Sequence, residues 1–164
     1  MSSVVNEIEK KSLKEEFFDA VNSGDVERVI DLFIKEKIDV NKMRDDKGWY
    51  AMHLAVMNND VNMIVTLRGL GADIDPQNDK FYGETPLYLA IDLRRKISTI
   101  EMLLALGAKP GIEMKHGLNA YDVMPKEPEY EAVLRKWLPQ EELAHLSRLH
   151  EKKEKKFRFK DLRR

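Results

Sequence analysis

Apolar residues recur at every third position in two stretches of the chain. They are Val26, Val29 and Leu32 in the first stretch, and Val61, Ile64 and Leu67 in the second. Such spacing places the apolar side chains on one face of an α-helix. The pattern therefore predicts two helices, each of which must bury one face against a neighbour.

A longer pattern repeats along the chain. Gly48 opens the segment G-W-Y-A-M-H-L-A-V, and Gly83, 35 residues later, opens G-E-T-P-L-Y-L-A-I. A third copy, G-L-N-A-Y-D-V-M, begins at Gly117, and residues 17–41 contain a fourth, degenerate unit. Repetition with a fixed period of this size is typical of a solenoid, in which each unit stacks on its neighbours to bury its apolar face.

The repeated unit resembles the ankyrin repeat, a β-turn and two antiparallel helices over about 33 residues, with the signature T-P-L-H-x-A. Residues 85–90 read T-P-L-Y-L-A and depart from this signature at one position, and residues 53–55 of the preceding unit keep H-L-A. Thr85 suits the N-cap of a helix, and Pro86 suits its first position. The resemblance covers about residues 12–138.

The resemblance implies an all-α fold, an ankyrin-repeat solenoid of stacked helix-turn-helix units joined by β-turn hairpins. We expect about four units, of which the first and the last are degenerate. Gly24 and Asn59 fall between the two helices of a unit, where the chain needs the left-handed conformation that these residue types tolerate. Small residues at Ala55 and Ala90 would let neighbouring helices approach closely.

The C-terminal part of the chain departs from the repeat. Pro139 ends the last repeat helix, and residues 140–150 are predicted to form a C-terminal capping helix. Its apolar stripe consists of Leu143, Leu146 and Leu149. We expect a flexible N-terminus at 1–11, an ankyrin-repeat domain at 12–138, and a capping helix with a basic tail at 139–164. From about Glu151 onward the tail should be mobile, since little apolar surface follows.

Charge is unevenly distributed along the chain. The 28 Lys and Arg nearly balance the 29 Asp and Glu, which leaves a net charge of −1. Residues 147–164, however, contain nine basic and three acidic residues, or +6, so the remaining residues carry −7. The near-neutral total therefore conceals a polarised molecule with a basic C-terminus.

Composition also restricts compartment and chemistry. The chain has no cysteine, which excludes disulfides, thiolate metal sites and cysteine nucleophiles, and it has no run of about 20 apolar residues that could span a membrane. The N-terminus lacks the apolar region of a secretory signal. We expect a monomer in a reducing compartment, the cytoplasm or alternatively the nucleus.

No catalytic, cofactor or metal site is predicted. The resemblance implies that His53 is a buried structural hydrogen-bonding residue, and His116, His145 and His150 lack the spacing of a zinc site. Residues 73–84 imitate a calcium loop at some acidic positions, but the required glycine is replaced by asparagine and a proline intrudes. We therefore expect a non-enzymatic protein.

Large aromatic residues flank the first glycine of two consecutive units. In the ankyrin family, partner contacts are commonly made by the hairpin tips and by the first-helix face. The residues at these positions are Asp46, Lys47, Trp49, Met57, Asn58, Phe81, Tyr82, Glu84, Asp92, Leu93, Lys115, His116 and Leu118. Trp and Tyr dominate interface hot spots, so we predict a protein-binding surface here. Alternatively, Phe81 folds back as a local core and Trp49 packs on its own hairpin.

The basic tail admits three interpretations. It is a solvated helix face, a nuclear-import or anionic-surface patch, or a segment that docks on a partner through Phe157 and Phe159. Our functional prediction is an interaction module or adaptor that binds a protein partner through its concave surface. The alternative is a regulatory protein whose tail contacts nucleic acid or an anionic membrane. The salt dependence of binding would separate the two, because phosphate contacts weaken steeply with salt.

Overall fold

The computed structural model describes residues 12–161, and within them all regular structure is helical. The predicted flexible segment 1–11 lies outside the described residues. The helices are α1 Leu13–Ser23, α2 Val26–Glu36, α3 Ala51–Met57, α4 Val61–Gly69, α5 Pro86–Asp92, α6 Ile97–Ala105, α7 Pro128–Trp137 and α8 Gln140–Asp161.

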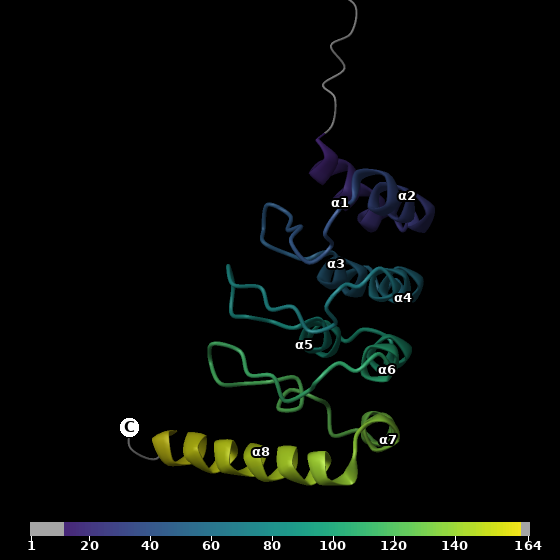
Figure 1. Ribbon diagram of the computed structural model, residues 1–164. Helices are drawn as coiled ribbons and strands as arrows, with labels where there is room; N and C mark the ends of the chain where they lie inside the picture. Colours follow the sequence, from purple (N-terminus) through teal and green to yellow (C-terminus); the bar gives the residue numbers. More distant parts are fainter. Residues whose placement is uncertain (1–11, 162–164) are drawn as a thin grey trace, which may run out of the picture.

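The helices stack in the order of the sequence (Figure 1). The first helices of the units, α1, α3 and α5, form one column, and α2, α4, α6 and α7 form a second column beside it. The connecting hairpins all project to the side of the first helices, and α8 lies across the end of the stack. This arrangement confirms the predicted all-α solenoid.

The core lies between consecutive units. Phe17, Met52, Ile64 and Leu103 are among its largest fully buried side chains. Ala55 and Ala90 are completely inaccessible. The apolar triads of the second helices face this core as predicted, with their first members partly exposed at the helix starts.

Local signals set the ends of the helices. Thr85 Oγ1 accepts a hydrogen bond from the Tyr88 amide at 3.2 Å, and Pro86 occupies the first helical position. Gly24 and Asn59 have φ values of 73° and 56° between the paired helices, as predicted.

The fourth unit lacks a regular first helix. Residues 120–123 form turns instead, in agreement with the expectation that the last repeat is degenerate. Asn119 takes the position of Thr85, and Asn119 Oδ1 accepts from the Asp122 amide at 3.0 Å as a helix cap would. Pro125 follows too soon for a second turn to form, because the residue before a proline avoids the α conformation.

The capping helix is longer than predicted. We expected it to end near His150, whereas α8 continues to Asp161. Its C-terminal half is rich in Lys and Glu, which have high helix propensity. His150 and Lys153 also make side-chain hydrogen bonds to the fourth unit, and these contacts hold this half of the helix in place.

Candidate protein-interaction surface

The hairpins are built around glycines in the left-handed conformation. Gly48, Gly83 and Gly117 have φ values of 82°, 79° and 77°, where a side chain would be strained. The residues beside these glycines are therefore presented at the same place in three consecutive hairpins. Because the units stack, equivalent positions of neighbouring hairpins come side by side.

An aromatic row runs along these hairpins. The row consists of Trp49, Phe81, Tyr82 and His116. The rings of Trp49 and Phe81 stack with centroids 5.1 Å apart and planes 12° apart, and those of Tyr82 and His116 lie 4.4 Å apart. The side chains therefore connect the hairpin of Gly48 to that of Gly83, and the hairpin of Gly83 to that of Gly117.

Lysine side chains tie the same hairpins to one another and to α1. Lys14 Nζ lies 2.7 Å from Asp46 Oδ1 and lowers the pKa of that carboxyl by donating a hydrogen bond to it. Lys80 Nζ donates to the Asp46 carbonyl at 2.9 Å, and Lys115 Nζ donates to the Asp79 and Phe81 carbonyls at 2.6 and 2.9 Å. These contacts hold the hairpin tips in a fixed arrangement.

His53 is buried beneath the aromatic row. Its Nδ1 accepts from the Tyr50 amide at 3.3 Å, and its Nε2 lies 3.0 Å from the Glu84 carbonyl of the next hairpin. Burial lowers the pKa of His53 to about 4, so the ring is neutral at pH 7. With these partners the proton belongs on Nε2, which donates to Glu84. His53 therefore joins two units, in the structural role expected.

The interpretation of the aromatic residues as local packing holds in part. Trp49 is half-buried and also packs against His53, at 5.2 Å between ring centroids, so it contributes to the packing between hairpins. Phe81 stacks on Trp49 but keeps 42% of its surface exposed, and Tyr82 keeps 53%. Phe81 and Tyr82 therefore remain accessible to a partner.

The other predicted positions fall into two groups. Lys47, Glu84 and Leu118 lie in the hairpins, where Glu84 Oε2 accepts from the Tyr82 amide at 3.1 Å and Leu118 is half-buried. The second group lies at the C-terminal ends of α3 and α5. It comprises the half-buried Met57 and the exposed Asn58, Asp92 and Leu93.

The acidic loop that imitates a calcium site engages the backbone. Asp73 Oδ1 accepts from the Asp75 amide at 3.0 Å, and the Asp75 carboxylate accepts from the Lys109 amide at 3.1 Å. Burial raises the pKa of Asp75 to about 6. Among residues 12–161, no group of three or more metal-binding side chains occurs, and no described helix is long and apolar enough to cross a membrane.

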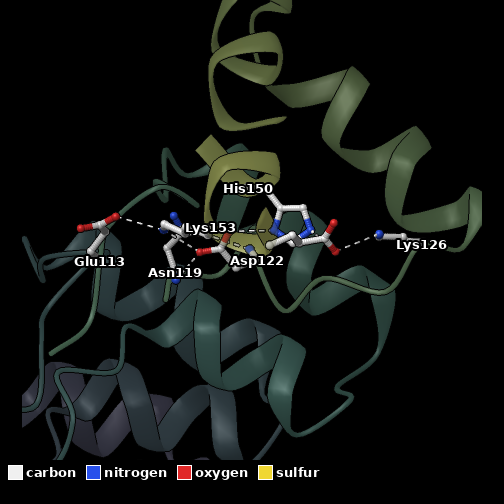
Figure 2. Close-up of polar contacts among 7 residues, drawn as sticks. Glu113, Asn119, Asp122, Lys126, His150 and Lys153 are labelled. Atoms are coloured by element: carbon white, nitrogen blue, oxygen red, sulfur yellow. Dashed lines mark hydrogen bonds and ion pairs between the residues drawn. The ribbon is translucent and has the colours of Figure 1, made fainter. Parts of the chain in front are cut away.

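A buried carboxylate that the sequence did not single out anchors α8. The side chain of Asp122 is only 3% exposed, and it accepts from His150 Nδ1 at 3.0 Å and from Lys153 Nζ at 2.7 Å. Figure 2 shows Lys153 between Asp122 and Glu113, whose carboxylate lies 3.0 Å from Lys153 Nζ. Asp122 follows the hairpin glycine by five residues, as His53 does. This shared position in the repeat was the signal in the sequence that could have identified Asp122.

These features define the class of the molecule as a helical-repeat protein with ordered, outward-facing hairpins. Residues 17–114 match the sequence profile of the family described as ankyrin repeats in 3 copies. The chain belongs to the ankyrin-repeat family. Ankyrin repeats generally mediate protein–protein interaction.

Individual relatives share the repeats over part of their length. The chain is 31% identical over 94 residues to human ankyrin repeat and SOCS box protein 6, covering 57% of this chain and 22% of that protein. It is 30% identical over 110 residues to an intracellular phospholipase A2 of Caenorhabditis elegans, covering 65% and 10%. It is 36% identical over 74 residues to the ANK repeat-containing protein nipk-1 of the same organism, covering 41% and 12%.

Proposed function

We propose that this chain is a non-enzymatic interaction module, an adaptor that binds a protein partner through the surface formed by its hairpins and first helices. The observation that carries the proposal is the aromatic row, in which Phe81 and Tyr82 stay exposed while Trp49 and His116 hold their rings in place. Exposed aromatic residues on an ordered support are typical of interface hot spots.

The mechanism follows from the rigidity of the hairpins. Inter-hairpin hydrogen bonds from Lys80 and Lys115 fix the tips before a partner arrives. A preformed surface loses little conformational entropy on binding, so a few anchor side chains can supply most of the affinity. Leu93, 40% exposed at the end of α5, adds an apolar position on the first-helix side of this surface.

A matched pair of variants tests the proposal. Phe81→Ala/Tyr82→Ala removes the exposed rings, whereas Ile34→Ala/Val65→Ala removes exposed apolar side chains from α2 and α4, in the other helix column. Proteins captured by each form are quantified by mass spectrometry, and the affinity of the most enriched one is then measured.

We expect the hairpin variant to lose about 1 to 4 kcal/mol of binding free energy for that protein, with little change in melting temperature. The helix variant should bind normally. Equal binding by both variants, or a loss confined to the Ile34/Val65 variant, would contradict the proposal.

A further inference from the structure

The helix α8 has two faces of different chemistry. One face packs on the fourth unit. There Leu146 is 4% exposed and approaches Gly111 so closely that a methyl group at residue 111 would lie 2.8 Å from Leu146 Cδ2. Arg148, Lys152 and Lys155 recur one helical turn apart and are exposed, as is the adjacent Lys156. We call these four residues the basic face of α8.

The packed face pairs its own charges. His150 and Lys153 bind Asp122, Lys153 also contacts Glu113, and Glu154 lies 3.4 Å from His150 and 3.7 Å from Lys126. Figure 2 shows this network, with Glu113 and Lys126 at its two ends. Acidic side chains that could neutralise the tail are therefore largely engaged on the packed face.

The basic face keeps its charge. Among the described residues, its four cations form no ion pair, and Glu151 is the exposed acidic residue beside them. Residues 147–164 carry +6 and the remaining residues carry −7, so the positive charge of the chain is concentrated from Ser147 onward. A polyanion would be attracted to this part of the chain.

We propose that the basic face of α8 binds the phosphate backbone of a nucleic-acid duplex. At 1.5 Å per residue, Arg148 and Lys156 are about 12 Å apart along the helix. A duplex presents about one phosphate per 1.7 Å of its axis when both strands are counted, so about seven phosphates, about half of them on each strand, lie within that length. A straight row of cations on a rigid helix can therefore contact several phosphates together.

A membrane surface fits this helix less well. A helix that lies in a membrane inserts its apolar face between the headgroups. In α8, Leu146 is buried against the fourth unit, and Leu143 and Leu149 are partly buried. Anionic lipids would therefore be held by charge alone, without the apolar contribution to binding.

The test measures fluorescence anisotropy of labelled 20-base-pair DNA and RNA duplexes with the full chain. The first variant is Lys152→Glu/Lys155→Glu/Lys156→Glu. The control, Lys35→Glu/Lys37→Glu/Lys42→Glu, makes the same change in net charge at exposed lysines near the start of the stack. Thermal melting verifies that both variants are folded.

We expect the α8 variant to bind a duplex at least about 30-fold more weakly than the unmodified chain at 50 mM salt, and the control to stay within about threefold. Four phosphate contacts predict that affinity falls about 150-fold between 50 and 200 mM salt. Equal losses in both variants, salt-independent binding, or no binding to either duplex would overturn the proposal. Binding to phosphatidylserine vesicles alone would identify a membrane surface instead, and binding to polyglutamate alone would identify an acidic protein segment.

Discussion

Replacing Asp75 by asparagine is expected to stabilise the protein at neutral pH. Asp75 lies at the base of the hairpin that contains Gly83. Its carboxylate accepts a hydrogen bond from the amide of Lys109, at the base of the hairpin that contains Gly117. The preceding hairpin has an amide at the equivalent place. There Asn41 Oδ1 accepts from the Asp73 amide at 2.7 Å, and Asn41 Nδ2 donates to the Gly71 carbonyl at 2.9 Å. Asparagine at residue 75 can make the same pair of bonds without a buried charge.

The magnitude follows from the pKa of Asp75. Burial raises this pKa from 3.8 to about 6. A rise of about two pKa units corresponds to about 3 kcal/mol of folding free energy. The side chain is only partly buried, so solvent screening reduces the expected gain to about 1 to 2 kcal/mol. Because the folded-state pKa is raised, the stabilising contribution of Asp75 is complete below pH 3.8 and is lost as the pH rises through about 6.

The assay is urea unfolding of both proteins between pH 4 and pH 7.5. Asp75→Asn should match the unmodified chain near pH 4 and exceed its stability by about 1 to 2 kcal/mol at pH 7.5. Both proteins contain His53, so its titration cancels in the difference. Asp73→Asn, at an exposed neighbour, serves as the control. A variant that is less stable at pH 7.5, or equally stabilised at every pH, would refute the reasoning.

Three further predictions test the core, the cap and the buried histidine. Leu103→Ala should cost about 2 to 5 kcal/mol in urea unfolding, whereas Val65→Ala, at a side chain 45% exposed, should cost under about 1 kcal/mol. Asp122→Ala leaves Lys153 without its buried partner, so it should lower the free energy of unfolding by about 2 to 4 kcal/mol. It should also accelerate hydrogen exchange of the α8 amides, and unchanged exchange would contradict the anchoring role. Because burial depresses the pKa of His53 to about 4, up to about 3 kcal/mol of stability should be lost as the pH falls from 6.5 to 4, and His53→Gln should abolish that dependence.

The parts of the fold that the sequence predicted are those encoded by nearby residues. The N-cap at Thr85, the proline that follows it and the left-handed Gly24 and Asn59 each act within one turn of chain. The buried faces of the second helices follow from their apolar period. The repeat also predicted that the units stack, because a unit of this kind cannot bury its apolar face alone.

Contacts between units were less predictable. The α6 helix has no side-chain cap of its own, and Asn59 of the preceding unit supplies the acceptor, with Asn59 Oδ1 2.6 Å from Thr99 Oγ1 and 3.3 Å from the Lys96 amide. Likewise, the stacking of Trp49 on Phe81 depends on how two hairpins align in space. A local motif identifies such residues as hairpin positions but does not identify their partners.

The end of the solenoid shows how one position changes its role with its neighbour. In the second unit, His53 donates to a carbonyl of the following hairpin. In the part of the chain that the structure describes, α8 rather than a hairpin follows the fourth unit, and the equivalent residue there is Asp122, a carboxylate that accepts from His150 and Lys153 of α8. Exchanging a donor for an acceptor thus lets a helix, rather than another repeat, cover the last unit. The same contacts direct His150 and Lys153 inward and leave the basic face of α8, Arg148, Lys152, Lys155 and Lys156, exposed.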